Sequence, residues 1–328
     1  MKRRIALLYG GAGSEHDVSV SGYKYMAELL KNECDLIPVY IARDGRWSVR
    51  YGGENISCYP ARGQGLMSAE GAIEIDVAIP LLHGDGGEDG VVQGALECAG
   101  IPYVGADVIT SAICIDKTYT KRIADSLGIP TLPDVSFTAA LSTEAALEEV
   151  KGHLSFPIFL KPRRLGSSVG AYPVRDDDEF RLFYPLSAKA GSGLVIAERM
   201  LSKKRELECA FCEYKGARTV TPPGEILVDG FYGYDEKYGG KTKTSPRADI
   251  PEHAVKEIVG YARLLADAVG LRHLGRIDLF LTDEGVYFNE INTFPGFTSE
   301  SLYPKMLTAY GIDPRDAILS FIEDAVGC

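Results

Sequence analysis

The stretch that decides the fold lies near the C-terminus, where residues 275–292 read GRIDLFLTDEGVYFNEIN. Apolar and polar residues alternate on both sides of residues 283–285, which is the pattern of two antiparallel strands joined by a tight turn. A three-residue turn with glycine at its end would place Thr282 opposite Val286. The turn length therefore sets which side chains face one another along this hairpin.

In that register Asp278 lies opposite Glu290 and Arg276 lies opposite Asn292, all on one face, because side-chain direction repeats every two residues. Directly opposed carboxylates destabilise a sheet, so a compensating cation is expected. A hard divalent cation such as Mg²⁺ takes oxygen ligands from Asp, Glu and Asn. Arg276 offers the alternative of a purely structural charge network. The spacing leaves both interpretations open, and a two-residue turn would break the pairing.

Upstream of this hairpin the sequence predicts a helix and a long loop. Apolar residues recur at helical spacing over residues 252–270, which indicates one buried face. Residues 231–247 show no clear period, and loops of this length usually have a functional reason. We interpret them as a candidate lid, with a surface excursion of no function as the alternative.

The first hundred residues alternate strand and helix signals. Strands are predicted at residues 4–9, 35–41 and 75–82, with helices near 18–30 and 90–99. This pattern is typical of a parallel α/β layout. A boundary is expected near residues 102–105, followed by one long helical run to Leu127 and then by a strand-rich α+β unit.

Composition narrows the class of protein. The chain has 328 residues, 45% of them hydrophobic, and a formal net charge of -11, which suits a globular protein of two or three domains. An acidic chain does not suit a general binder of nucleic acid or anionic membranes. The apolar run from Ile5 to Tyr9 is too short for a signal peptide or a membrane span, so a cytoplasmic location is expected. The Cys209-x-x-Cys212 pair lacks a second pair, so zinc is not favoured.

Two glycine loops lie beside predicted strands. Residues 9–15 read YGGAGSE and fit neither a dinucleotide nor a Walker fingerprint. Glu15 suits a ligand ammonium, although an acid favoured at a helix start is the simpler explanation. Residues 166–170 read GSSVG and match the G-x-S-x-G pattern of serine hydrolases, with Ser168 as nucleophile. An extended segment follows instead of a helix, so a phosphate-wrapping loop is favoured.

Five separated motifs occur in order: GGAGSEHDVS, LLHGDGGEDGVVQG, an Asp116-Lys117 pair, KPRRLGSSVG, and GRIDLF through NEINTFPGFTSESLYP. Together they resemble the D-alanine:D-alanine ligase family of the ATP-grasp superfamily along nearly the whole chain. The resemblance implies a three-domain α/β ATP-grasp fold with ATP between the last two domains. It would divide the chain into an N-terminal parallel α/β substrate-binding domain (1–104), a central ATP-grasp subdomain (105–201) and a C-terminal ATP-grasp subdomain (202–328).

The same resemblance implies roles for individual residues. Those expected to bind ATP are Lys117, Lys161, Glu198, Leu201, Glu206 and Lys237. Those expected to bind two Mg²⁺ or Mn²⁺ ions are Asp278, Glu290 and Asn292. Those expected to orient substrates or stabilise the reacting groups are Glu15, Ser167, Tyr238, Arg276 and Gly296. Those expected to complete the amino-acid sites are His83, Ser301 and Leu302.

The implied reaction joins two D-alanines through a D-alanyl phosphate, for peptidoglycan precursor synthesis in the cell wall. D-serine or D-lactate as second substrate is the alternative, although Lys237-Tyr238 and Leu302 favour D-alanine. A nucleotide sensor without turnover is the alternative from another class. The expected partners are small molecules, with neither nucleic acid nor membrane, and relatives of this kind are commonly homodimers.

Overall fold

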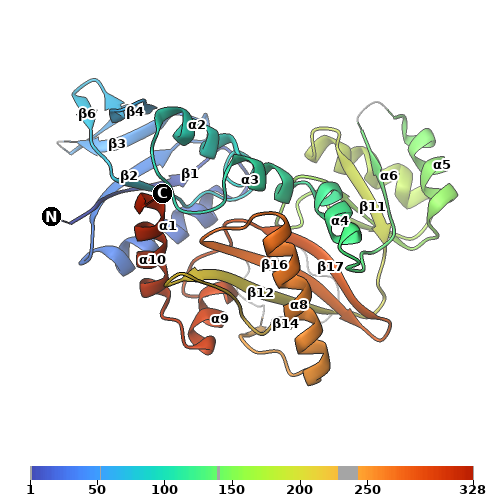
Figure 1. Ribbon diagram of the computed structural model, residues 1–328. Helices are drawn as coiled ribbons and strands as arrows, with labels where there is room; N and C mark the ends of the chain where they lie inside the picture. Colours follow the sequence, from blue (N-terminus) through green and yellow to red (C-terminus); the bar gives the residue numbers. More distant parts are fainter. Residues whose placement is uncertain (1, 52, 139–140, 228–242, 328) are drawn as a thin grey trace.

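The computed structural model describes residues 2–51, 53–138, 141–227 and 243–327 (Figure 1). Within these ranges the strands form three sheets of seven, four and six strands. The predicted lid residues Lys237 and Tyr238 lie outside the described residues. No helix in the described ranges combines the length and the apolar character needed to cross a membrane.

The seven-stranded sheet has the order β6-β5-β4-β3-β2-β1-β7. Its strands are β1 (Arg4–Gly10), β2 (Asp35–Ile41), β3 (Trp47–Tyr51), β4 (Glu54–Ala61), β5 (Gly65–Ser68), β6 (Gly71–Ile73) and β7 (Val77–Pro80). The predicted helices are α1 (His16–Leu30) and α2 (Val91–Ala99). β1 pairs with β2 and β7 in parallel, as predicted.

Every pair from β2 to β6 is antiparallel, so the first sheet is mixed and the predicted parallel pairing is confined to β1, β2 and β7. Strands β3 to β6 form a meander in which short connections replace helical crossovers. Gly45 and Gly63 adopt positive φ in the connections that precede β3 and β5, which glycine allows at little cost. Antiparallel strands need only such short connections, whereas parallel strands need a crossover of a dozen residues or more.

The four-stranded sheet has the order β10-β9-β11-β8 and is antiparallel throughout. Its strands are β8 (Asp134–Phe137), β9 (Ile158–Pro162), β10 (Tyr172–Val174) and β11 (Val195–Arg199). Helices α5 (Thr143–His153) and α6 (Asp177–Ala190) pack on it around a core that includes Phe137 and Phe180. This unit has the strand-rich α+β character that the sequence predicts.

The third sheet has the order β15-β14-β12-β16-β17, with β13 paired to β12. Its strands are β12 (Arg205–Tyr214), β13 (Ala217–Val220), β14 (Gly224–Leu227), β15 (Lys243–Ser245), β16 (Leu274–Thr282) and β17 (Gly285–Asn292). Helix α8 (Glu252–Ala268) buries Ile258, Ala262 and Leu265 against one face, as the helical spacing predicts.

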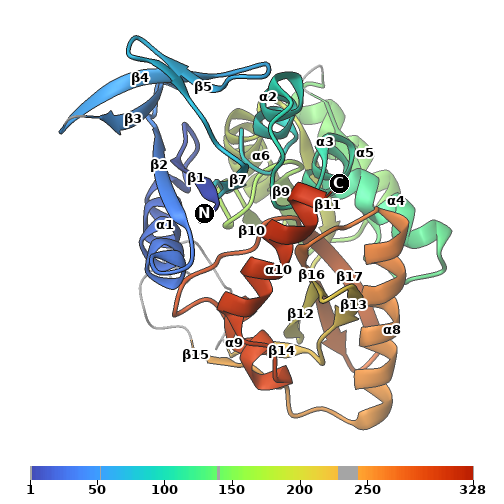
Figure 2. The ribbon, with the colours of Figure 1, turned by 60° about the vertical axis from the view of Figure 1, so that its left-hand side comes forward.

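The opposite face of this sheet is shared between apolar and charged residues. Ala210 and Leu274 pack with α9 (Leu302–Tyr310) and α10 (Pro314–Gly327). The same core contains Ile5 of β1, so the first and third sheets are joined, and Figure 2 shows α10 lying between them. Further along the strands the side chains of this face become acidic and border the site.

The predicted long helix before Leu127 is two helices, α3 (Val108–Ile115) and α4 (Lys117–Ser126). Asp116 separates them with an extended backbone at φ -92° and ψ 102°. Its side chain accepts a hydrogen bond from the Thr118 N–H and caps α4. Since a side-chain cap satisfies an orphan N–H at a helix start, the aspartate favours a new helix over a continuous one.

The hairpin of β16 and β17 differs from the predicted turn length but keeps the predicted pairing of its charged residues. Thr282 pairs with Gly285, so the turn has two residues rather than three. A β-bulge then interrupts the ladder after Asp278 and leaves Asn289 as the extra residue of β17. The bulge restores the predicted pairs, Asp278 with Glu290 and Arg276 with Asn292.

Candidate active site

Two cavities meet at the charged face of the third sheet. The larger, of about 750 Å³, lies between the first and third sheets. The smaller, of about 460 Å³, lies between the second and third. Their walls share Lys117, Ser167, Glu206 and Glu290. A small molecule in one cavity would therefore lie directly beside a small molecule in the other.

Every predicted site residue within the described ranges lines at least one cavity. The larger one is lined by Glu15, His83, Lys117, Ser167, Glu206, Arg276, Asp278, Glu290, Asn292, Gly296, Ser301 and Leu302. The smaller one is lined by Lys117, Lys161, Ser167, Glu198, Leu201, Glu206 and Glu290. Residues that are far apart in the sequence thus converge on one place.

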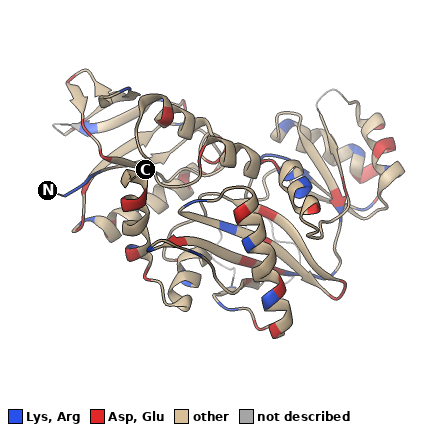
Figure 3. Cartoon of the chain, in the orientation of Figure 1, with Lys and Arg blue, Asp and Glu red and all other residues tan. Residues whose placement is uncertain are grey.

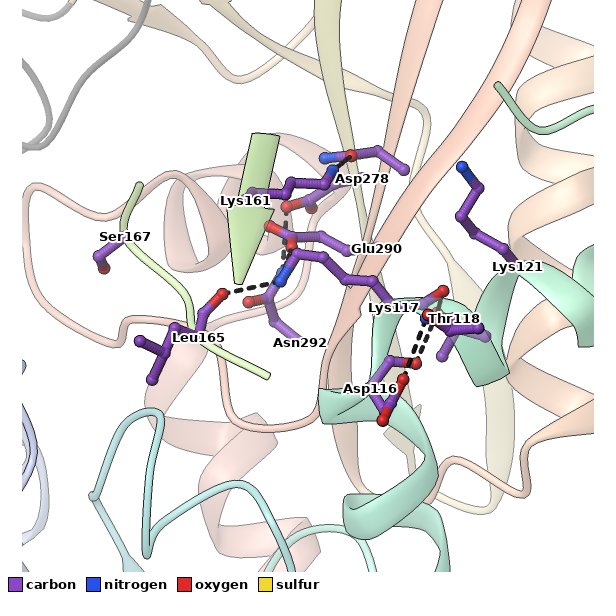
Figure 4. A network of polar contacts seen from close by, with 12 residues as sticks. Asp116, Lys117, Thr118, Lys121, Lys161, Leu165, Ser167, Asp278, Glu290 and Asn292 are labelled. Carbon is purple, nitrogen blue, oxygen red and sulfur yellow. Dashed lines mark hydrogen bonds and ion pairs between the residues drawn. The ribbon is translucent and has the colours of Figure 1, made fainter. Parts of the chain in front are cut away.

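The carboxylates of the hairpin form ion pairs with positively charged side chains. Arg276 donates from Nε to Asp278 Oδ1 and from Nη2 to Oδ2, each at 2.7 Å. Asn292 Nδ2 donates to Asp278 Oδ2 at 3.0 Å. Lys117 Nζ lies 3.0 Å from Glu290 Oε2 (Figure 4). Burial opposes the charge of Arg276, but the surrounding carboxylates hold its pKa well above its ordinary value.

The hairpin residues also have the chemistry of a magnesium site that needs phosphate. Within the described residues, no group of three or more His, Cys, Asp or Glu could hold a metal ion. Asp278, Glu290 and Asn292 nevertheless bring two carboxylates and an amide oxygen to one cavity wall. Mg²⁺ is usually held by one or two carboxylates together with water and substrate phosphates. These side chains could therefore hold the ion together with a nucleotide.

Glu198 on β11 lies between two lysines in the wall of the smaller cavity. Its Oε1 is 2.7 Å from Lys121 Nζ, and its Oε2 is 2.6 Å from Lys161 Nζ. Lys121 Nζ also lies 2.7 Å from Leu132 O and 3.0 Å from Asp134 Oδ1. Burial raises the pKa of Glu198, but the two lysines outweigh it and lower the pKa to about 2.

Sequence reasoning missed Lys121, although the helical spacing held a signal. Lys121 follows Lys117 by four residues on α4, so both side chains lie on one face of that helix. Burial lowers the pKa of Lys121, but Glu198 and Asp134 raise it further than burial lowers it. Its ammonium is surrounded by three acceptors, which satisfies all three of its donors.

The residues that precede the glycine-serine loop (166–170) contact the start of α4. Lys117 Nζ donates to Leu165 O at 2.8 Å. Arg163 and Arg164 both reach Asp116, with Nη2 of Arg163 and Nε of Arg164 each 2.8 Å from Oδ2. These contacts explain why two arginines precede the loop: they balance a fully buried carboxylate.

The loop itself has the geometry of an anion-binding turn. Ser167 and Ser168 adopt positive φ of 53° and 58°, a conformation that is uncommon outside glycine. The strand β10 follows the loop where a serine hydrolase would need a helix. The hydrolase alternative therefore lacks its required geometry, while successive backbone N–H groups in such turns suit phosphates.

One side of the larger cavity is built by four segments, which contain Glu15, His83, Ser167 and Phe294. Ser167 Oγ donates to Glu15 Oε1, which joins the glycine-serine loop to the start of α1. His83 Nδ1 donates to Phe294 O at 3.1 Å. Burial lowers the pKa of His83, which favours its neutral ring. These contacts bring the first sheet against the segment that contains Gly296.

Glu88 was missed by sequence reasoning, although it lies within the quoted HGDGGEDG motif. Its two oxygens accept from the Gly84 and Phe294 N–H groups, each at 3.0 Å. Burial raises the pKa of Glu88 to about 7. His83 and Glu88 thus hold the carbonyl and the N–H of Phe294, and they fix the segment that leads to Gly296.

A cavity between two sheets, with a glycine-serine loop and a carboxylate face on its walls, is the arrangement expected of an ATP-grasp ligase. Solved structures agree in fold. D-alanyl-alanine synthetase A from Vibrio cholerae superposes with a TM-score of 0.89 at 33% identity, covering 100% of this chain and 99% of that one. The VanG D-Ala:D-Ser ligase from Enterococcus faecalis gives 0.88 at 32% identity, covering 99% and 100%.

The family follows from the sequence comparisons. The D-ala D-ala ligase N-terminus family matches residues 4–106, and the D-ala D-ala ligase C-terminus family matches residues 123–323. The D-alanine--D-alanine ligase A of Chromobacterium violaceum is 33% identical over 99% of this chain and 95% of its own length. The D-alanine--D-alanine ligase of a Thermoanaerobacter species is 36% identical over 94% and 92%. The chain belongs to the D-alanine–D-alanine ligase family of ATP-dependent ligases.

Proposed function

We propose that the protein joins two D-alanines to D-alanyl-D-alanine, with ATP converted to ADP and phosphate, for peptidoglycan precursor synthesis. The observation that carries this proposal is the meeting of the two cavities at Lys117 and Glu290. One cavity has lysines suited to phosphates, and the other has Glu15, which is suited to an ammonium. A carboxylate in the larger cavity could therefore approach a phosphate in the smaller one.

The nucleotide would occupy the smaller cavity. Lys117 and Lys161 would contact its phosphates, and Ser167 and its neighbours would cover them with backbone N–H groups. Glu198, Leu201 and Glu206 would contact the adenine and the ribose, and Lys237 would belong to the lid. The buried position of Glu198 and its lysine partners supports this assignment, because it fixes the lysine ammonium groups in the cavity wall.

Two Mg²⁺ or Mn²⁺ ions would be held by Asp278, Glu290 and Asn292 together with the nucleotide phosphates. When bound, they would offset phosphate charge and hold the γ-phosphate in line with its acceptor. The acidic cavity wall supports this proposal, because Lys117 and Arg276 already neutralise part of its charge. The cations would complete that neutralisation.

The first D-alanine would bind in the larger cavity. Glu15 would accept its ammonium, His83 would lie near its carboxylate, and Ser167 with Tyr238 would orient it. A carboxylate is a poor acyl donor, and transfer of the γ-phosphoryl group converts one of its oxygens into a leaving group. Positioning and electrostatics supply most of the catalysis of such a step.

The second D-alanine would then attack the acyl phosphate, held by Ser301 and Leu302. Arg276 and the Gly296 N–H would stabilise the tetrahedral oxyanion. Ser301 Oγ would lie only 3.1 Å from a Cβ at position 296, so a side chain there would crowd the second site. A closed lid with Lys237 and Tyr238 would keep water from the acyl phosphate.

D-serine as second substrate is a second candidate, because VanG, a D-Ala:D-Ser ligase by its name, shares the fold at 32% identity. Leu302 is buried and apolar, which favours D-alanine. An apolar pocket rejects an added hydroxyl only weakly, so we expect D-serine to be used at higher concentration. The homodimer, the cytoplasmic location and the three domains (1–104, 105–201 and 202–328) stay predictions.

The test is ADP release by purified protein with ATP and Mg²⁺. D-alanine would be added alone and then together with D-serine or D-lactate, with products identified by mass. Release with D-alanine alone and a D-alanyl-D-alanine mass are expected. A product that forms only with D-serine or D-lactate would reassign the second site. No ADP in any mixture would contradict the ligase and favour a nucleotide sensor.

A further inference from the structure

The charged face of the third sheet contains a third carboxylate that neither the hairpin nor its motifs include. Glu208 lies on β12 directly opposite Asp278, which in turn lies opposite Glu290. Three acidic residues from three neighbouring strands therefore form one row, which we call the carboxylate row. Glu208 is 5% exposed and lines the larger cavity.

Arg276 lies within reach of two members of the row. Its guanidinium makes two hydrogen bonds of 2.7 Å to Asp278. Its Nε also lies 3.4 Å from Glu208 Oε2. The residue opposite Arg276 on β12 is Ala210, which offers no charge. On the β12 side, Glu208 is thus the carboxylate available to this arginine.

Asp278 already accepts three hydrogen bonds from Arg276 and Asn292, so a divalent cation bound by its oxygens competes with the arginine. When it turns an oxygen to the cation, the arginine loses part of its partner. A guanidinium left unpaired in a largely buried site is costly. A second carboxylate within ion-pair distance removes that cost, because the guanidinium can move toward it without leaving the cavity wall.

We propose that Glu208 is a positioning residue that receives Arg276 when Asp278 binds a divalent cation. This inference rests on the proposed metal site. In this arrangement Glu208 makes release of Asp278 easier. It also keeps Arg276 in the wall of the cavity that Gly296 lines as well. Glu208 acts through Arg276 and is not itself a ligand of the cation.

The test is a double-mutant cycle on Mn²⁺ affinity, measured by electron paramagnetic resonance with saturating ADP. Glu208→Gln should weaken Mn²⁺ binding about tenfold, as expected for directly coupled side chains. In an Arg276→Met background the same change should have no effect, because no guanidinium remains to be received. Arg276→Gln serves the same purpose if Arg276→Met does not fold.

The cycle separates this inference from two simpler explanations. If Glu208 acted only through its negative charge, or as a direct ligand, Glu208→Gln would weaken Mn²⁺ binding equally in both backgrounds, and the proposal would be wrong. An unchanged affinity in Glu208→Gln would also overturn it. ADP affinity without the cation and thermal unfolding should stay near those of the unmutated protein.

A matched control lies in the same sheet. Glu225 on β14 is also a buried glutamate paired with an arginine, 2.6 Å from Arg205 Nη2, but it does not line either cavity. Glu225→Gln should leave Mn²⁺ affinity unchanged. If the unmutated protein with ADP binds no Mn²⁺, the proposed metal site fails and this inference fails with it. If it binds Mn²⁺ and Glu208→Gln binds equally well, only this inference fails.

Discussion

Two charged clusters border the cavities, one at the smaller and one mainly at the larger, and they differ in how their charges balance. The Glu198 cluster contains Glu198 and Asp134 with Lys121 and Lys161, so two carboxylates meet two lysines. The carboxylate row contains Glu208, Asp278 and Glu290, and ion pairs join it to Arg276 and Lys117. Among the described residues, the first cluster pairs two carboxylates with two lysines, whereas the second sets three carboxylates against one arginine and one lysine.

Burial does not separate the two clusters. The side chain of Asp134 in the first is 22% exposed, whereas Glu208 and Glu290 in the second are 7% and 19% exposed. Elsewhere, acidic and basic residues are interspersed over all parts of the chain (Figure 3). A cluster whose carboxylates are matched by lysines stabilises the fold, while a row whose carboxylates outnumber the cationic side chains beside it is suited to a metal ion that arrives with a ligand.

The largest effect that this comparison predicts is on catalysis. Glu290→Gln removes a carboxylate from the row without changing the size of the side chain. We expect ADP release to fall on the order of a thousandfold, because the phosphoryl group loses electrostatic stabilisation at the reacting centre. Steady-state kinetics over a range of Mg²⁺ concentrations would measure it.

Asp283→Asn is the matched control, since it alters an exposed acid in the turn of the same hairpin. Its rate should stay within twofold of the unmutated protein, roughly the range of a neutral surface change. Glu290→Gln with near-normal turnover and normal folding would remove the distinction between the two clusters.

The next effect is on stability. Lys121→Met leaves Asp134 and one oxygen of Glu198 without their buried cation. We expect the free energy of unfolding to fall by about 3 kcal/mol, as when one partner of a buried ion pair is removed. Urea unfolding with and without ADP would measure it.

Lys151 provides the comparison, because its ion pair with Asp177 is nearly half exposed. Solvent screens such pairs, so Lys151→Met should leave the free energy of unfolding unchanged within error. Equal losses of unfolding free energy in both variants would show that Lys121 stabilises the fold no more than the exposed Lys151 does.

The sequence predicted the carboxylate pair for a partly wrong reason. Strand alternation is a local signal, so both strands of the hairpin could be located. The turn at Thr282 and the bulge at Asn289 each shift the register by one residue, and the two shifts cancel. A bulge depends on contacts outside its strand: here Lys161 Nζ lies 3.2 Å from Asn289 Oδ1. Strand periodicity alone could not show it.

The residues that sequence reasoning missed share another cause. Glu208, Lys121 and Glu88 each act on a side chain or backbone group distant in sequence. Glu208 lies in a strand that pairs with β16 only in the folded protein. Residue spacing reveals partners on one hairpin or helix face, whereas partners across elements require the topology. The meander of β3 to β6 was missed because the turns in this part of the sequence were not interpreted as connections between antiparallel strands.

The smallest effect concerns pH and tests whether the Glu198 cluster is the structural one. The pKa of Glu198 is about 2 in the folded protein, below the ordinary value of 4.5. A carboxylate with a lowered folded-state pKa stabilises the fold when ionised, fully above about pH 4.5, and this stabilisation is lost as pH falls toward 2. The Glu198→Gln variant has no ionisable group at this position, so its free energy of unfolding should not fall through this group on acidification. Urea unfolding from pH 7 to pH 3 should therefore show that the free energies of unfolding of the two proteins converge as pH falls. The change is the smallest of the three because pH 3 is still above the folded-state pKa. A difference that stays constant or widens on acidification would mean that the lysines do not stabilise the Glu198 carboxylate, and the contrast with the carboxylate row would lose its electrostatic basis.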